Sequence, residues 1–291
     1  MGPGFDAIAV ALNLYVEVTI ELADEFAITS EGNGAGVFDD DQNLAAVVAT
    51  SILGHSNFNL HVKSEIPVSR GLGSSAALAL AAAGAAGATD PLRVAASIDG
   101  HAENAGASML GGLVAAGVRD GEVAARSLVL DDVWRFVVVV PETQLKTADA
   151  RRVLPSSVPF SDAVANLSAL GLLLAGLANH EAFVPWSMDD TLHQPYRMEL
   201  LDFARPLLEC LRDAGARGSC WSGAGSSMLG LCEVAAAPHV AEAARQLFPV
   251  VEPPDELWEH IKSKIEAESG SADNHLEQNV MDAALSSRKP S

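Results

Sequence analysis

The chain has 291 residues, a formal net charge of −20 and three cysteines. So acidic a surface excludes nucleic acid and anionic membranes as expected partners, because both demand a basic patch. No apolar run reaches the length of a membrane span and the N-terminus is not basic, so we expect a soluble, cytoplasmic protein. Cys210, Cys220 and Cys232 have neither zinc-site spacing nor an even count, which favours buried reduced thiols.

The N-terminal segment Gly2-Pro3-Gly4-Phe5-Asp6 is typical of a turn, and the alternation over residues 16–20 predicts a strand. Asp6 is either a turn aspartate or a ligand-binding carboxylate. The acidic stretch 39–43 precedes an apolar helix predicted over 44–53, and it suits a helix cap better than a metal site.

A loop between a strand and a helix is the most informative stretch of the chain. The strand ends at Ile66, and from Ala77 to Ala88 the composition predicts a helix of small residues. A glycine-rich loop that enters a helix N-terminus offers unpaired N–H groups to a phosphate, although a plain cap after a flexible turn is the alternative. The loop has neither a Gly-Lys pair nor a dinucleotide fingerprint. Its residues are Pro67, Val68, Ser69, Arg70, Gly71, Leu72, Gly73, Ser74, Ser75, Ala76 and Ala77.

A polar cluster follows, with Asp99, His101, Glu103 and Asn104 before a Gly-Gly pair. Such side chains can bind both a hydroxyl and an amine, but a structural histidine is the alternative for His101. Further along, the β-branched run 137–140 predicts a strand buried on both faces or at a sheet centre.

Two arginines stand in the second half of the chain. Thr147 and Arg151 are four residues apart, so on a helix they share a face, and Arg can grip a carboxylate in a bidentate fork. The alternative is a capping Thr147 beside a solvated Arg151. A long apolar helix beginning at Asp162 is expected in the core, and Arg197 ends a segment that begins at Met188.

The last motif is a glycine turn formed by Ser222, Gly223, Ala224 and Gly225, between two predicted apolar elements. Alone it is a weak signal, because Gly-x-Gly turns are common. Beyond Glu252 we expect one amphipathic helix and a polar tail over 269–291.

These motifs, in this order, resemble the homoserine kinases of the galactokinase, homoserine kinase, mevalonate kinase and phosphomevalonate kinase (GHMP) superfamily. The resemblance covers roughly residues 2–250, and it is carried by the segments 2–6, 67–77, 99–104, 147–155, 190–197 and 222–225. It implies an α+β fold with a ribosomal-S5-like N-terminal domain (1–130) and a ferredoxin-like α/β-sandwich C-terminal domain (131–268), followed by a flexible tail (269–291).

The resemblance also implies the chemistry, which is phosphorylation of the L-homoserine hydroxyl by ATP with Mg²⁺ on the pathway to threonine. The loop 67–77 and residues 222–225 would bind ATP, and Ser75 would help to hold magnesium. Asp6, His101, Glu103 and Asn104 would orient the amine and hydroxyl, with Asp6, His101 and Asn104 closest to the catalysis. Thr147, Arg151 and Arg197 would hold the carboxylate. Relatives are often dimers, so the resemblance is compatible with a homodimer.

Two departures from the family pattern qualify these expectations. The family has a first strand ending in Ser-Ala-Asn-Leu before Gly-Pro-Gly-Phe-Asp, and this chain begins after it. The family's magnesium-binding Glu would fall near Arg93. Two alternatives therefore stay open, namely a related kinase for another small hydroxyl compound and a non-catalytic ligand-binding protein.

Overall fold

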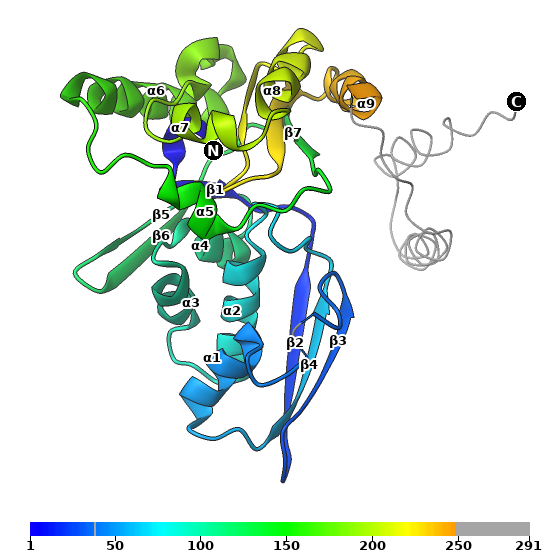
Figure 1. The fold of residues 1–291 in the computed structure, drawn as a ribbon. Coiled ribbons are helices and arrows are strands. Elements are labelled where there is room, and N and C mark those ends of the chain that lie inside the picture. The colour runs from blue at the N-terminus through cyan, green and yellow to red at the C-terminus, as the bar shows by residue number, and fades with distance from the viewer. Residues whose placement is uncertain (38, 248–291) are drawn as a thin grey trace, which may run out of the picture.

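The computed structural model describes residues 1–37 and 39–247. Figure 1 shows a lower lobe of strands β2–β4 with helices α1–α3, and an upper lobe that carries α6–α9 and β7. Strand β1 and helices α4 and α5 lie where the two lobes meet. The amphipathic helix and the polar tail predicted beyond Glu252 fall outside the described residues.

The sheet of the lower lobe has β4 at its centre, antiparallel to β2 and parallel to β3. Phe58, Leu60 and Val62 of β4 are buried and alternate with polar residues, as the sequence pattern predicts. The side of β4 that carries these residues packs on helices, and the other side is polar. The strands are β2 (Val16–Leu22), β3 (Ala27–Gly32) and β4 (Phe58–Ser64).

Four helices belong to this lobe and its junction. The helix predicted over 44–53 is confirmed, and its N-terminus is capped by Asn43, whose side chain accepts from the Ala45 N–H. The alanines of α2 let it lie close to the sheet, and Ala76, Ala79 and Ala82 are fully buried. The helices are α1 (Leu44–Leu53), α2 (Ser74–Ala85), α3 (Pro91–Asp99) and α4 (Glu103–Leu110).

A second sheet brings the start of the chain to the junction between the lobes. Strand β1 pairs antiparallel with β5, with Ile8 opposite Ala115, and β5 also pairs with β6. This pairing fixes Asp6 just before the strand and beside α4. The strands are β1 (Ile8–Val10), β5 (Leu113–Arg119) and β6 (Glu122–Leu128).

The upper lobe contains a third sheet, in the order β7-β9-β8, with helices α8 and α9 packed on it. The predicted strand forms as β7, but in the described part of the chain it lies at the edge of its sheet and not at the centre, and its residues after Trp134 are only partly buried or exposed. Both faces of the strand meet apolar clusters, Val137 and Val139 on one side and Phe136 and Val138 on the other, but no strand covers its free edge in the described part of the chain. The elements are β7 (Trp134–Val139), β8 (Gly218–Trp221), β9 (Met228–Glu233), α8 (Ala204–Asp213) and α9 (Ala237–Leu247).

Helix α6 (Phe160–Ala178) belongs to the core on one side only, where Leu173 and Leu177 are buried in an apolar cluster. The helix is long and apolar enough to cross a membrane by length and composition alone, with a mean hydropathy of 1.5. In the structure 28% of this apolar stretch is buried. Its buried side includes Asn166, whose amide donates to the Pro3 carbonyl at 2.8 Å and so ties the helix to the N-terminus. Short helices complete the lobe: η1 (Gly2–Gly4), α5 (Thr147–Arg152), η2 (His180–Ala182), η3 (Pro185–Met188), α7 (Gln194–Arg197) and η4 (Met198–Leu200).

Candidate active site

A cleft of about 960 Å³ lies at the junction of the lobes. Most of the residues predicted from the sequence line this one cleft, and Val68 and Gly225 are the exceptions. Those that line it are Asp6, Pro67, Ser69, Arg70, Gly71, Leu72, Gly73, Ser74, Ser75, Ala76, Ala77, His101, Glu103, Asn104, Thr147, Arg151, Arg197, Ser222, Gly223 and Ala224. Segments far apart in the sequence therefore form one site.

The phosphate-loop side is built from backbone. Helix α2 begins at Ser74, three residues earlier than predicted, and its N-cap is Gly73 with φ 74°. No side chain in the described part of the chain caps this N-terminus, which disfavours the alternative of a plain cap. Its N–H groups and the positive end of the helix dipole are therefore available to an anion. An uncapped end of a 12-residue helix at a cleft suits a phosphate group.

The opposite side of the cleft is built from charged side chains. Arg151 and Asp6 form a bidentate ion pair at 2.8 and 2.9 Å, with both side chains about one-third exposed. Asp6 has φ 54°, an uncommon conformation for a residue with a side chain. Arg151 and Thr147 lie one turn apart on α5, as their spacing predicts. A charged pair that solvent reaches can exchange partners with a bound zwitterion.

Arg197 is the most buried charge of the site, with no exposed surface. Its Nε donates to the Ala150 carbonyl, and its Nη1 contacts both His193 Nδ1 and the Gly223 carbonyl at 3.1 Å. Burial and the nearby Arg151 lower the pKa of Arg197 to about 10, so it remains cationic at neutral pH. Its Nη2 has no hydrogen-bond partner among the described residues.

Phe5 and His193 support the two arginines. The Phe5 ring stacks on His193 at 4.5 Å between centroids, and the guanidinium carbons of Arg197 and Arg151 lie 4.7 and 5.2 Å from its centre. Burial and the charge of Arg197 lower the pKa of His193 to about 3, so His193 is neutral. It can then accept from Arg197 through Nδ1 and donate to the Gly2 carbonyl through Nε2, at 3.0 Å.

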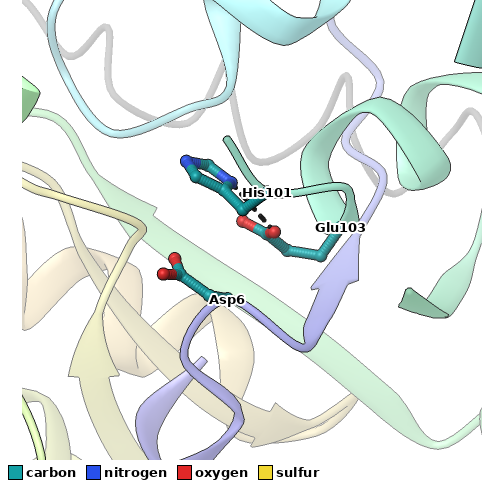
Figure 2. Close-up of side chains that lie close together, drawn as sticks. All are labelled: Asp6, His101 and Glu103. Atoms are coloured by element: carbon teal, nitrogen blue, oxygen red, sulfur yellow. Dashed lines mark hydrogen bonds and ion pairs between the residues drawn. The ribbon is translucent and has the colours of Figure 1, made fainter. Parts of the chain in front are cut away.

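Glu103 organises the polar cluster at the start of α4. It is 6% exposed, and its two oxygens bond to His101 Nδ1 at 2.9 Å and to the Asn104 amide at 2.8 Å. The bond to Glu103 raises the pKa of His101 despite partial burial. Figure 2 shows the His101–Glu103 bond above the Asp6 carboxylate, which comes from a distant segment of the chain.

Asp6, His101 and Glu103 have potential metal-ligand atoms within 4.8 Å of one another. The carboxylate oxygens of Asp6 and Glu103 already have partners. Asp6 accepts two hydrogen bonds from Arg151, and Glu103 is bonded to His101 and Asn104. The positive charge of Arg151 beside Asp6 also opposes the binding of a divalent cation. The trio therefore fits an amine or hydroxyl group better than a metal.

Asp99 is a further carboxyl of the cleft, for which the sequence indicated no role. It lies at the C-terminal end of α3 and lines the cleft, and burial raises its pKa. A carboxylate is the donor type that magnesium prefers, and Asp99 lines the same cleft as the phosphate-loop serines. Arg93 lies in the first turn of the same helix, is exposed and does not line the cleft.

Sequence analysis also missed Phe5 and His193. The two residues lie within the segments 2–6 and 190–197, which carry the family resemblance. However, an aromatic ring and a neutral histidine that contact neighbouring arginines produce no recognisable spacing in the sequence. Only the fold brings the N-terminus onto α7.

Comparison with known proteins agrees with this geometry. Residues 43–112 match the model of the GHMP kinases N terminal domain, and residues 164–250 match that of the GHMP kinases C terminal region. The chain is 38% identical over 248 residues to a homoserine kinase of Carboxydothermus hydrogenoformans, covering 79% of this chain and 81% of that protein. A homoserine kinase of Moorella thermoacetica is 36% identical, with 80% and 83% covered.

Solved structures show the same similarity. A homoserine kinase from Cytophaga hutchinsonii superimposes with a TM-score of 0.74 at 27% identity, covering 85% of this chain and 86% of that one. A phosphomevalonate kinase of Streptococcus pneumoniae, at 13% identity and a TM-score of 0.65, shares the fold alone. These matches confirm the two-domain α+β fold that the sequence motifs imply.

Proposed function

The chain belongs to the homoserine kinase family of the GHMP kinases, and on that premise we propose that it transfers the γ-phosphoryl group of ATP to the side-chain hydroxyl of L-homoserine. The observation that carries the proposal is the pairing of two features in one cleft. An uncapped helix N-terminus faces the same space as Arg197, whose buried Nη2 has no partner among the described residues.

The phosphate loop would hold the triphosphate. The α2 N-terminus supplies N–H donors, and Gly71 and Gly73, at φ 71° and 74°, let the backbone approach the phosphates. Residues 222–224 close the cleft beside the loop. The transferred group is thus oriented by backbone rather than by a side-chain nucleophile, which is adequate because phosphoryl transfer depends mainly on positioning and charge neutralisation.

The acceptor side would hold the amino acid by both of its charges. The α-carboxylate would accept a hydrogen bond from Arg197 Nη2 and would compete with the Asp6 carboxylate for Arg151. The α-amine would then form an ion pair with the Asp6 carboxylate that Arg151 has released. Thr147 would add its hydroxyl to the carboxylate site. His101, Glu103 and Asn104 would border the side-chain hydroxyl and fix its direction. We assign no side chain as general base.

Magnesium fits this cleft on the chemistry of its donors. Ser75, exposed at the start of α2, and the partly buried Asp99 would hold it. The ion would neutralise charge on the phosphates. Without it the acidic side chains of the cleft would oppose an incoming triphosphate. A cytoplasmic location follows from the proposal, since the reaction uses ATP, and the homodimer stays a prediction.

A coupled ADP-release assay on the full chain, with ATP and magnesium, tests the proposal. We expect turnover that depends on L-homoserine, and no turnover of its methyl ester, because the ester cannot satisfy the two arginines. Absence of homoserine-dependent turnover, or equal use of the ester, would contradict the proposal.

A further inference from the structure

The glycine hairpin, which we define as residues 222–227 between β8 and β9, is locked onto the phosphate loop. Ser222 Oγ donates to the Gly71 carbonyl at 2.9 Å, and the Ser227 N–H donates to the Arg70 carbonyl at 3.2 Å. A Cβ at Gly71 would lie 2.1 Å from the Ser222 carbonyl oxygen, so the two backbones touch. Any movement of the hairpin must therefore move the phosphate loop.

The same hairpin also holds the acceptor side. Arg197 Nη1 donates to the Gly223 carbonyl at 3.1 Å, and this carbonyl belongs to the residue directly after Ser222. One residue thus touches the phosphate loop and the next touches the buried arginine. The connection is short and rigid, because the Gly225 N–H bonds back to the Ser222 carbonyl at 2.9 Å and closes a tight turn.

We propose that Ser222 is a positioning residue that couples the two substrate sites, so that homoserine and nucleotide each strengthen binding of the other. The inference rests on the proposed function, which places the homoserine carboxylate on Arg197. A carboxylate on Nη2 would restrain the guanidinium, and Nη1 would then restrain the Gly223 carbonyl. Ser222 passes that restraint to Gly71. Coupling of binding sites is reciprocal, so nucleotide on the loop must favour homoserine equally.

Calorimetry on the full chain tests this coupling. The measured quantity is the ratio of the homoserine Kd without nucleotide to its Kd with saturating magnesium and a non-hydrolysable ATP analogue. In the unchanged protein we expect a ratio of about ten, within the usual range for coupled sites. Each variant is compared with itself, so a loss of affinity for one ligand alone does not alter the ratio.

Three variants separate coupling from general damage. Ser222→Ala should bring the ratio below about two, and Ser222→Thr, which keeps the hydroxyl, should restore most of it. Ser219→Ala is the matched control. Its hydroxyl donates to the Leu208 carbonyl at 2.8 Å, in the same lobe, but Ser219 does not line the cleft. This control should keep the ratio of the unchanged protein.

The outcomes are distinct. A ratio near one in the unchanged protein, or an undiminished ratio in Ser222→Ala, would overturn the coupling while homoserine-dependent turnover still supports the kinase proposal. A reduced ratio in Ser219→Ala equal to that in Ser222→Ala would assign the effect to general loosening and also overturn it. Absence of homoserine turnover would instead contradict the proposed function, and this inference with it.

Discussion

The two sides of the cleft are built on opposite principles. The phosphate-loop side is one continuous segment, residues 67–77, which offers backbone donors at the start of α2. The acceptor side is assembled from side chains that meet only in the fold, and Asp6 and Arg151 are 145 residues apart. A backbone site is sensitive to added volume, whereas a side-chain site is sensitive to lost charge.

This difference predicts which substitutions each side can accept. A glycine replaced by alanine should harm the phosphate loop, where backbone conformation and space are limiting. Loss of a charge should harm the acceptor side, where charged side chains hold one another and the substrate.

The largest effect is expected for Arg197→Met. The change removes the buried cation and leaves the Ala150 carbonyl, His193 Nδ1 and the Gly223 carbonyl without their donor. We expect kcat/KM for homoserine to fall about a thousandfold, equivalent to about 4 kcal/mol, which is in the range for breaking a buried charged network. Steady-state kinetics measures it, with urea unfolding as a check on the fold.

Two further variants sharpen the Arg197 result. Arg197→Lys keeps the charge but supplies one compact ammonium in place of a fork, so most of the loss should remain. Arg205→Met removes an exposed arginine of α8 that does not line the cleft and should leave kcat/KM unchanged. Near-normal activity of Arg197→Lys would show that charge alone suffices, contrary to the geometry.

The next effect is expected at Gly71. Gly71→Ala places a side chain at φ 71° and its Cβ 2.1 Å from the Ser222 carbonyl oxygen. Left-handed strain and overpacking together should lower the free energy of unfolding by about 3 kcal/mol. Displacement of the loop should weaken binding of a non-hydrolysable ATP analogue about a hundredfold. Denaturant unfolding and calorimetry measure the two quantities.

Gly84→Ala is the matched control for Gly71. Gly84 lies in the last turn of α2, and a Cβ there would meet nothing within 4 Å in the described part of the chain. Alanine should therefore stabilise the protein by about 0.5–1 kcal/mol. If the two substitutions changed stability alike, close approach of the two backbones would not explain the role of Gly71.

A smaller effect is expected for Arg151→Met. Arg151 is about one-third exposed, so water compensates part of the lost ion pair with Asp6. We expect the KM for homoserine to rise about tenfold, at the low end for hydrogen bonds to charged groups. The Kd of the nucleotide analogue should change far less. Steady-state kinetics and calorimetry separate the two.

Arg152→Met controls for the loss of one positive charge on the same helix. Arg152 is 76% exposed and pairs with Asp149, away from the cleft. If Arg152→Met also raised the KM for homoserine tenfold, the effect would come from the overall positive charge of α5 and not from a contact between Arg151 and the substrate. Equal weakening of nucleotide and homoserine in Arg151→Met would break the division between the two sides.

The same division explains what the sequence could predict. The phosphate loop is contiguous, so its residue types, order and position between β4 and α2 were readable before the fold was known. The spacing of Thr147 and Arg151 was also sufficient to place them on one helical face. By contrast, the support of Arg197 by Phe5 and His193 depends on a contact between the N-terminus and α7, which no local pattern reveals.

The structural errors have equally physical causes. An apolar sequence indicates that a strand or helix can be buried, but it does not indicate which neighbours will cover it. For this reason β7 and α6 were expected to be more deeply buried than they are. A plain cap at α2 stayed open as the alternative because serines at a helix start are good caps in general. Here the helix starts at Ser74 itself, with Gly73 as N-cap, and its N–H groups remain open to the cleft.

The smallest effect is expected for Glu103→Gln, which changes a charge but almost no volume. The bond to Glu103 is the main cause that raises the pKa of His101, so the pKa of His101 should fall in the variant. The Gln amide can still donate to a neutral His101, so kcat/KM should fall only a few-fold. NMR titration of the His101 ring measures the pKa, with His180, whose partner Asp131 lies outside the cleft, as an internal reference that should not move.

The sign of the accompanying stability change follows from linkage. A histidine whose pKa is raised by folding adds stability that is complete below its unfolded pKa, about 6.5, and is lost as the pH rises through the folded value. The unchanged protein should therefore lose this contribution on going from pH 6 to pH 9, and the difference between the two pH values should shrink in Glu103→Gln. An unchanged His101 pKa in the variant would show that the Glu103 bond does not hold the proton on His101. The acceptor side would then depend on its arginines alone.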